Sequence, residues 1–313
     1  MTNLSEFTFL SSDGKTQLHG MLWEPEGVAV RAVLQICHGV AEHIARYDGF
    51  ARALNEQGIV VAGHDHLGHG KSLPEGGTPV YFGQGSTWNT VVDDIYILHQ
   101  RLKQRYPDAP LCIMGHSMGS FLTRTYLIRY PGTVKAAVIM GTGWQPQAAI
   151  TGGLALANAI AAVSGENATS ELVTELAFGS YNKLFAPNRT KVDWLSADES
   201  NVDDYIADPL CGADATVGLF RQMLHGIRFN QRQSHLRQMD REMPVLFVAG
   251  DKDPVGNCGK GVRQTYDAFR AAGMRDCTLK LYPGLRHEIL NEKAYTADIT
   301  KNIEAWLLSR LEK

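Results

Sequence analysis

A run of apolar residues that leads directly into Gly-His-Ser-Met-Gly constrains this chain more than any other stretch. Residues 111–114 are apolar, Gly115 and Gly119 flank Ser117, and a helix-like run begins at Met118. The order predicts a strand, a sharp turn and a helix. Small residues on both sides relieve steric crowding around a strained turn residue. We therefore expect Ser117 to hold its hydroxyl exposed at the edge of a sheet.

The overall composition is that of a globular protein and excludes several function classes. The 313 residues are 44% hydrophobic, which is enough for a substantial core. A net charge of -3 gives no basic surface for nucleic acid. The five cysteines are odd in number and form no Cys-x-x-Cys pair, so we expect free thiols. The first 14 residues lack the features of a secretory signal, and a cytoplasmic location is expected.

Strand-like and helix-like segments alternate along much of the chain. A hairpin is predicted over residues 7–10 and 18–23, and further strands over 31–38, 59–62, 134–140, 245–249 and 277–282. Amphipathic helices separate most of these strands. Such alternation predicts an α/β fold, with a mostly parallel central sheet flanked by helices and functional groups at the carboxyl ends of the strands.

The alternation stops after Gly143 and returns at Pro244. Residues 144–239 contain only helix-like segments, which we read as a helical cap inserted between two strands. The predicted organisation is a core of residues 1–143 plus 240–313 and a cap of residues 144–239.

A serine nucleophile needs a base, and the base needs an orienting acid. On this type of sheet the order along the chain is serine, acid, histidine. Asp253 follows the strand at 245–249 and is our candidate acid, with Asp251 as the alternative. His287 is the only histidine of eleven that follows the last strand, and it is the candidate base. The alternative interpretation is a solvated loop carboxylate for either aspartate and a capping or surface histidine for His287.

A tetrahedral intermediate also requires backbone donors aimed at its oxygen. One expected donor is the N–H of Met118, directly after the nucleophile. The second is the N–H of Val40, in the loop after the strand at residues 31–38. Only the main chain of these two residues is predicted to act.

Five segments together give the chain a family resemblance. It resembles the α/β-hydrolases of the monoacylglycerol lipase and lysophospholipase group, the serine aminopeptidase S33-like branch. The H-G-x-x-E-H-x-x-R-Y form is specific to that branch. The segments are His38-Gly-Val-Ala-Glu-His-Ile-Ala-Arg-Tyr47, Asp65-His-Leu-Gly-His-Gly-Lys-Ser72, Gly115-His-Ser-Met-Gly119, Gly250-Asp-Lys-Asp253 and Arg286-His-Glu-Ile-Leu-Asn-Glu292.

The resemblance implies a cofactor-independent serine hydrolase for monoacylglycerols, lysophospholipids or related esters, with an apolar tunnel in the cap. It also implies that Glu42 and Arg46 hold the alcohol head group. An ion pair between these two residues, four apart in the chain, is the alternative. Animal monoglyceride lipases have a second histidine three residues after the catalytic one, where this chain has Leu290. The loop after the early strand lacks the Gly-Gly-x-Gly of proline aminopeptidases, which disfavours peptidase activity.

Two other features each allow two interpretations. His64, His66 and His69 could suggest zinc ligands, but the nearby glycines fit a tight turn equally well, and we predict no metal. The apolar segment at residues 154–163 is predicted to cover the acyl pocket. A transient contact of this segment with a membrane surface is the second interpretation.

Three further functions use the same residue pattern. An acyltransferase and a carboxylesterase for small soluble esters would need the same serine, acid and histidine. A non-catalytic binding protein could keep the same fold. The sequence predicts no particular oligomeric state.

Overall fold

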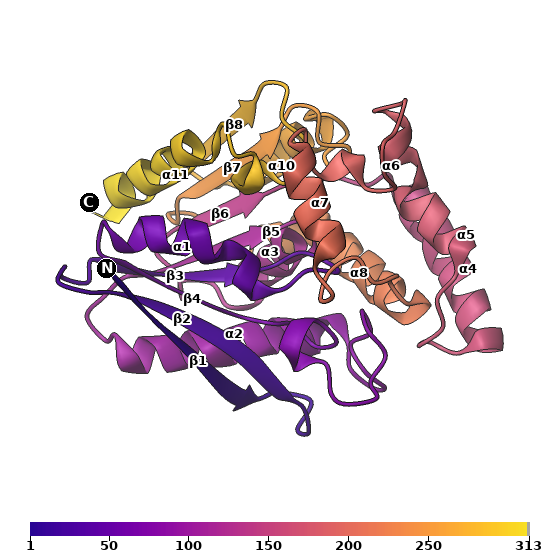
Figure 1. Cartoon of the computed structure of the whole chain (residues 1–313), viewed down its shortest axis with the longest axis horizontal. Coiled ribbons are helices and arrows are strands. Elements are labelled where there is room, and N and C mark those ends of the chain that lie inside the picture. The colour runs from indigo at the N-terminus through magenta and orange to yellow at the C-terminus, as the bar shows by residue number, and fades with distance from the viewer. Residues whose placement is uncertain (312–313) are drawn as a thin grey trace.

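Eight strands form one sheet at the centre of the computed structural model, which describes residues 1–311 (Figure 1). The strand order is β1-β2-β4-β3-β5-β6-β7-β8, and β2 runs antiparallel to both β1 and β4, whereas the other neighbours are parallel. The predicted α/β class is therefore confirmed. The strands are β1 (Thr2–Leu10), β2 (Gln17–Pro25), β3 (Ala32–Cys37), β4 (Ile59–His64), β5 (Leu111–His116), β6 (Ala137–Met140), β7 (Val245–Gly250) and β8 (Cys277–Tyr282).

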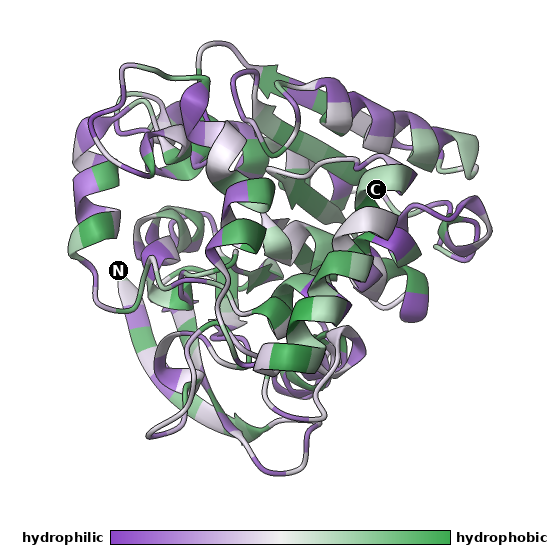
Figure 2. Ribbon diagram, turned by 90° about the vertical axis from the view of Figure 1, so that its right-hand side faces the viewer, coloured by the Kyte–Doolittle hydropathy of each residue, from purple (hydrophilic) through white to green (hydrophobic). Residues whose placement is uncertain are grey.

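The central strands are hydrophobic because helices cover both faces of the sheet. Every residue of β3, β4, β5 and β7 is buried, which accounts for their predominantly apolar sequences. In Figure 2 the strands are predominantly hydrophobic, whereas the surrounding helices mix hydrophobic and hydrophilic residues. Strands β3 and β5 are direct neighbours, with Cys37 paired to Gly115. This pairing brings the loop after β3 next to the turn after β5.

Two groups of helices enclose the sheet. Helices α1 (Asp48–Asn55) and α11 (Thr296–Leu311) pack on one face. Helices α2 (Trp88–Arg105), α3 (Met118–Arg129) and α10 (Lys260–Ala271) pack on the other. Helix α2 begins at a capping box, in which the side chains of Thr87 and Thr90 bond to each other's backbone N–H.

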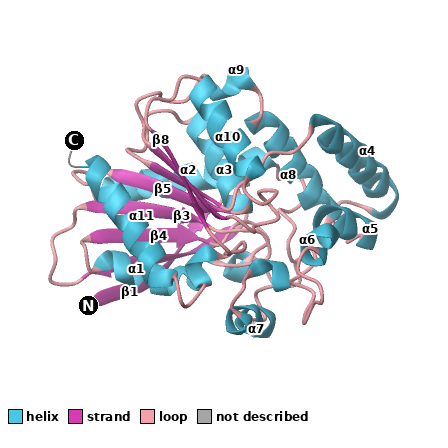
Figure 3. Ribbon diagram, turned by 90° about the horizontal axis from the view of Figure 1, so that it is seen from above, coloured by secondary structure: helices cyan, strands magenta, loops and turns pink. Residues whose placement is uncertain are grey.

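The segment between β6 and β7 consists of helices joined by loops and forms no strand, apart from an isolated bridge between Thr169 and Thr216. Figure 3 shows α4, α5 and α6 beyond the carboxyl ends of the strands. Helix α8 packs against both α3 and α4 and so connects the cap to the core. The helices are α4 (Gln147–Ser164), α5 (Glu171–Thr174), a π-helix (Glu175–Gly179), α6 (Ser180–Lys183), α7 (Glu199–Ala207), α8 (Val217–Asn230) and α9 (Gln233–Leu236).

Two of the cap helices have notable ends. Helix α5 continues directly into the π-helix. Helix α4 begins at Gln147, because Pro146 fits a helix N-terminus, where its missing N–H costs nothing. Within the described residues, α4 alone is long and apolar enough to cross a membrane by length and composition. One such helix is weak evidence for a membrane span.

Candidate active site

Ser117 occupies a strained turn between β5 and α3. Its backbone angles are φ 53° and ψ -121°, a conformation that is rare for a residue with a side chain. The flanking glycines permit this turn. A Cβ atom at Gly115 would lie 2.2 Å from the carbonyl oxygen of Gly119, and one at Gly119 would lie 2.0 Å from that of Cys37. The Gly-x-Ser-x-Gly pattern is therefore required by close backbone packing.

The structure brings Asp253 and His287 together at the carboxyl ends of β7 and β8. His287 Nδ1 lies 2.9 Å from Asp253 Oδ1, and both side chains are almost completely buried. Asp251 is placed differently, because its Oδ1 accepts a hydrogen bond from the backbone N–H of Gly284 near the surface. Of the two aspartates considered from the sequence, Asp253 is the one that contacts the histidine.

His287 also lies close to the turn that carries Ser117. The ring centroid of His287 is 4.6 Å from that of His116, the residue before Ser117. The ring centroid of His287 is also 5.1 Å from that of Trp194 in the cap. His287, in contact with Asp253, therefore lies beside the turn that carries Ser117, where general-base activation of its hydroxyl would place a histidine.

The loop after β3 lies against the serine turn. A Cβ atom at Gly39 would be 3.1 Å from Ser117 Cβ, so only glycine fits at this approach. Val40 and Met118 line the same pocket as Ser117. Their backbone N–H groups are placed on the two segments that the oxyanion prediction requires.

An apolar pocket of about 400 Å³ opens beside Ser117. Its volume falls in the range of small-molecule binding sites. The walls come mainly from the cap, and the residues that line the pocket include no charged side chain. The apolar lining residues of the cap helices include Ala149, Ile150, Leu156 and Ala157 of α4, Val173, Leu176, Ala177 and Phe178 of α5 and the π-helix, and Phe220, Met223, Leu224 and Ile227 of α8.

Glu42 and Arg46 form a buried network instead of facing this pocket. Arg46 Nη1 donates to Glu42 Oε2 at 3.0 Å and to Glu288 Oε1 at 2.6 Å, and its Nη2 donates to Glu288 Oε2 at 2.8 Å. Glu42 Oε1 accepts from the backbone N–H of Gly39 at 2.5 Å and lies 3.1 Å from His116 Nδ1. The geometry fits the ion-pair alternative, with the difference that the pair is buried. Neither residue lines the pocket.

The charged groups of this network stabilise one another's ionised forms. Burial opposes ionisation of Glu42, but the hydrogen bond to His116 and the charge of Arg46 outweigh it and hold its pKa well below the ordinary value. Burial likewise opposes ionisation of Glu288, and Arg46 lowers its pKa. The pKa of His116 is raised, because Glu42 outweighs the effect of burial.

The histidines after β4 form a buried turn. Burial lowers the pKa of His64 to about 3 and that of His69 to about 4, so both are neutral near pH 7. A Cβ atom at Gly68 would lie 2.0 Å from the carbonyl oxygen of Tyr81, and its φ is +73°. The carboxylate of Asp65 accepts from the backbone N–H groups of Ile44 and Lys71. These contacts fit the tight-turn interpretation.

Glu288 was not identified from the sequence as part of the site. Glu288 follows His287 directly and precedes the buried Ile289 and Leu290. A carboxylate in such an apolar segment requires a cationic partner. That requirement was the available signal, although the sequence does not show that the partner is Arg46.

Comparison with known proteins agrees with this arrangement. The family described as "Serine aminopeptidase, S33" matches residues 28–294. The chain is 31% identical to a monoacylglycerol lipase of Mycolicibacterium smegmatis over 98% of both chains, and 28% identical to human monoglyceride lipase over 96% of this chain and 89% of the relative. A carboxyl esterase from Bacillus coagulans, solved in complex with glycerol, superposes with a TM-score of 0.92 at 26% identity, covering 99% of this chain and all of the other.

These matches extend over nearly the whole chain, including the cap. The chain therefore belongs to the serine aminopeptidase S33 family of α/β-hydrolases, as an ester hydrolase of its monoacylglycerol lipase branch.

Proposed function

We propose that the protein hydrolyses esters that join one acyl chain to a small uncharged alcohol, most specifically monoacylglycerols. The observation that carries this proposal is the uncharged pocket beside Ser117. An apolar wall suits an acyl chain, and burial of its methylene groups contributes about 0.8 kcal/mol each. The names of the relatives, monoacylglycerol lipase and monoglyceride lipase, support the same substrate class.

In the proposed reaction Ser117 attacks the ester carbonyl while His287 accepts its proton. Asp253 orients His287 and stabilises the imidazolium that forms. The N–H groups of Val40 and Met118 stabilise the negative oxygen of the tetrahedral intermediate. The bond to the alcohol then breaks, and His287 returns the proton to the departing alcohol. Water attacks the acyl enzyme by the same sequence of steps and releases the fatty acid.

A neutral head group is favoured over a lysophospholipid. A phosphate would need cationic or N–H donors, and the lining of the pocket has no lysine or arginine. Arg46 is committed to Glu42 and Glu288, so head-group binding by Arg46 would break a buried ion pair. We propose that Glu42 and Arg46 position the loops around Ser117.

The alcohol site differs from that of animal monoglyceride lipases. Leu290 packs in the hydrophobic cluster beneath α1 and α11, where it has no polar group to offer glycerol. A carboxylesterase with broad tolerance for the alcohol is therefore the second candidate, and the similarity to the Bacillus coagulans carboxyl esterase favours it. Acyl transfer to another alcohol would use the same acyl enzyme.

A substrate panel tests the proposal. Monoacylglycerols of increasing acyl length are compared with lysophosphatidylcholines and methyl esters of the same acyl chains, and kcat/KM is measured for each. We expect kcat/KM to rise with acyl length and to be higher for monoacylglycerols than for lysophosphatidylcholines. A strong preference for acetyl esters would contradict the proposal. Equal rates for methyl and glyceryl esters would favour the broad carboxylesterase, and acyl products formed with added alcohols would reveal transfer.

Active-site labelling tests the chemistry separately from the substrate. A fluorophosphonate should add its mass to the peptide that contains Ser117. Folded protein that remains unlabelled would instead fit a non-catalytic binding protein.

The cap also offers a surface for lipid contact, and we propose that it touches a membrane surface transiently. Leu172, Leu176 and Leu184 are more than half exposed, and Val163 at the end of α4 is 89% exposed. Leu176 also lines the pocket, so this apolar surface adjoins the substrate site. Co-flotation with phosphatidylcholine vesicles is the expected result. It should be lost when the three leucines are replaced by serine, and absence of flotation by the unaltered protein would exclude the contact.

A further inference from the structure

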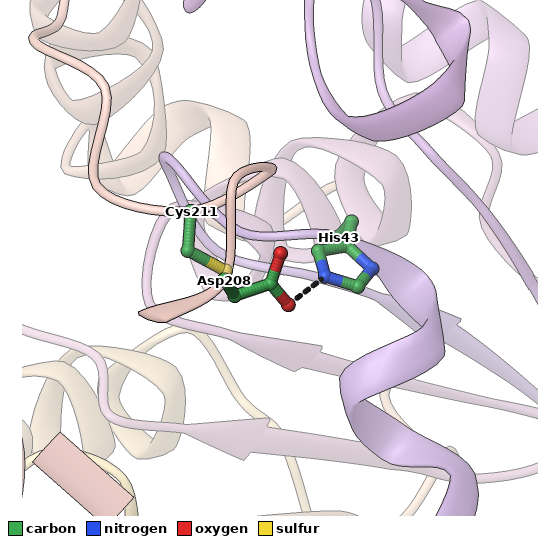
Figure 4. A group of neighbouring side chains, drawn as sticks. All are labelled: His43, Asp208 and Cys211. Atoms are coloured by element: carbon green, nitrogen blue, oxygen red, sulfur yellow. Dashed lines mark hydrogen bonds and ion pairs between the residues drawn. The ribbon is translucent and has the colours of Figure 1, made fainter. Parts of the chain in front are cut away.

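Three side chains with metal-binding atoms meet where the cap touches the loop after β3. His43 lies in that loop, and Asp208 and Cys211 lie in the turn that follows α7 (Figure 4). One imidazole nitrogen, one carboxylate oxygen and the sulfur all lie within 4.8 Å of one another. His43 Nε2 is 2.8 Å from Asp208 Oδ2. None of the three residues belongs to the proposed catalytic machinery.

The backbone holds these side chains in place. Within the turn, the N–H of Cys211 donates to the carbonyl oxygen of Asp208 at 3.0 Å, and the N–H of Leu210 donates to Asp208 Oδ1 at 2.8 Å. The turn is tied to the core because the N–H of Gly212 donates to the carbonyl oxygen of Ala41 at 3.0 Å. The two ligand-bearing segments are therefore already fixed against each other.

The donor set determines which cation fits. A thiolate and an imidazole suit Zn²⁺ and Co²⁺, whereas Mg²⁺ and Ca²⁺ prefer sites made of oxygen atoms. Ligand atoms around a tetrahedral Zn²⁺ lie about 3.3–3.8 Å apart. The 2.8 Å separation of His43 Nε2 and Asp208 Oδ2 must therefore widen by about 0.5 Å, and any separation near the 4.8 Å limit must close by about 1 Å. We propose that His43, Asp208 and Cys211 form a binding site for a divalent transition metal such as Zn²⁺, with water as the fourth ligand.

The charges around the cluster permit such an ion. The carboxylate of Asp208 and the thiolate of Cys211 together balance the two positive charges. Arg46 is close to Cys211, but its guanidinium is bonded to Glu42 and to both oxygens of Glu288. Binding of the metal ion releases the proton of the Cys211 thiol. The ion also takes the place of the proton in the hydrogen bond between His43 and Asp208.

The partial exposure of the site gives the ion a route from solvent. His43 is buried, whereas Asp208 and Cys211 are half-buried, so the cluster has a protein side and an open side. A bound ion would connect the cap directly to residue 43, three residues after Val40. The proposed ester chemistry does not use the ion, so the site stabilises the attachment of the cap.

Cobalt spectroscopy tests the ligand set directly. Co²⁺ is added to the full-length protein, and the expected spectrum shows a sulfur-to-cobalt charge-transfer band in the near ultraviolet with visible bands of tetrahedral Co²⁺. Zn²⁺ should displace Co²⁺, and calorimetric titration with Zn²⁺ should give one site per chain. Absence of the charge-transfer band would overturn the proposal.

Matched variants separate this cluster from other thiols and histidines. Cys211→Ser, His43→Gln and Asp208→Asn should each weaken Zn²⁺ binding by at least about tenfold to a hundredfold, the range found when even an outer partner of a metal ligand is lost. Cys258→Ser and His225→Gln alter an exposed cysteine and a histidine elsewhere and should leave binding unchanged. Equal binding by all five variants would also overturn the proposal.

Asp208→Asn tests metal binding in a variant that is expected to remain folded. The asparagine carbonyl can still accept the hydrogen bond from the N–H of Leu210, and its amide N–H can donate to Nε2 of the neutral His43 ring, so the turn should remain in place while the metal loses its carboxylate. Zn²⁺ should raise the melting temperature of the unaltered protein and leave that of Asp208→Asn unchanged. An equal rise in both proteins would show that Zn²⁺ binds somewhere else.

Discussion

The side chains on the two sides of Ser117 differ in polarity. On one side Glu42, Arg46 and Glu288 form buried ion pairs that connect the loop after β3 to the loop after β8. On the other side the pocket is bounded by apolar side chains of α4, the π-helix and α8. The polar side joins segments of the core, whereas the apolar side is contributed mainly by the cap.

The two sides therefore have different roles: the polar side positions the loops around Ser117, and the apolar side selects the acyl chain. Buried charges are stable only in pairs, so the polar side permits few arrangements and holds the loops of Gly39 and His287 in fixed positions. Apolar contacts are non-directional, and a change of shape in the pocket alters which acyl chain fits before it alters the fold. The polar side should therefore tolerate substitution poorly, and the apolar side should respond through substrate preference.

The largest effect is expected at Ser117, where the two sides meet. Ser117→Ala removes the nucleophile and should lower kcat on the order of 10⁶-fold, as in serine proteases. The side chain is small and close to the pocket, so the melting temperature should change little. Ester hydrolysis and thermal unfolding are measured on the same preparation. A variant that kept most of its activity would place the nucleophile elsewhere.

The next largest effect is expected at Asp253. Asp253→Asn retains the shape of the side chain but no longer selects the correct histidine tautomer, and kcat should fall by about 10⁴-fold. Asp251→Asn is the matched control, because its carboxylate bonds only to a loop N–H among the described contacts, and kcat should change less than about threefold. A larger loss of kcat in Asp251→Asn than in Asp253→Asn would show that Asp251 is the acid that orients His287.

Removal of Arg46 tests the polar side. Arg46→Met leaves Glu42 and Glu288 buried without their cation and should lower the free energy of unfolding by about 3–5 kcal/mol. Arg52→Met breaks an ion pair with Asp48 that is exposed and also four residues apart, and it should cost less than about 1 kcal/mol. Urea unfolding measures both. Similar losses in the two variants would show that burial of the network contributes little.

Much of the core could be predicted because its signals are local. The serine turn is specified by residues 115–119, and the strands of the parallel sheet are short apolar runs bounded by turns. The positions of Asp253 and His287 follow from chain order once the sheet is recognised, because parallel strands end at one edge. Local pattern and topology together were enough to bring these side chains to one place.

The features of the site that the sequence did not predict depend on contacts between residues that are distant in the chain. Arg46 and Glu288 are 242 positions apart, and no local pattern pairs them. The same is true of His43 and Asp208, which meet only because the turn after α7 packs on the loop after β3. Glu42 and Arg46 have helical spacing, but Glu42 precedes a 3₁₀ helix (Ile44–Tyr47), and the network of which the pair is part is buried. Their burial decides their role, and burial is a tertiary property.

The smallest effect is expected on the apolar side, where Ala157 lines the pocket and is 1% exposed. Ala157→Leu should shorten the acyl site and lower kcat/KM for long-chain monoacylglycerols by about tenfold to a hundredfold, with little change for short chains. Ala155→Leu adds the same volume to the exposed face of α4 and should leave both rates unchanged. Because the added side chain enters a cavity, the melting temperature should also stay nearly constant. Equal losses for short and long chains would mean that Ala157 affects the geometry at Ser117, and the separation of positioning from selection between the two sides would then fail.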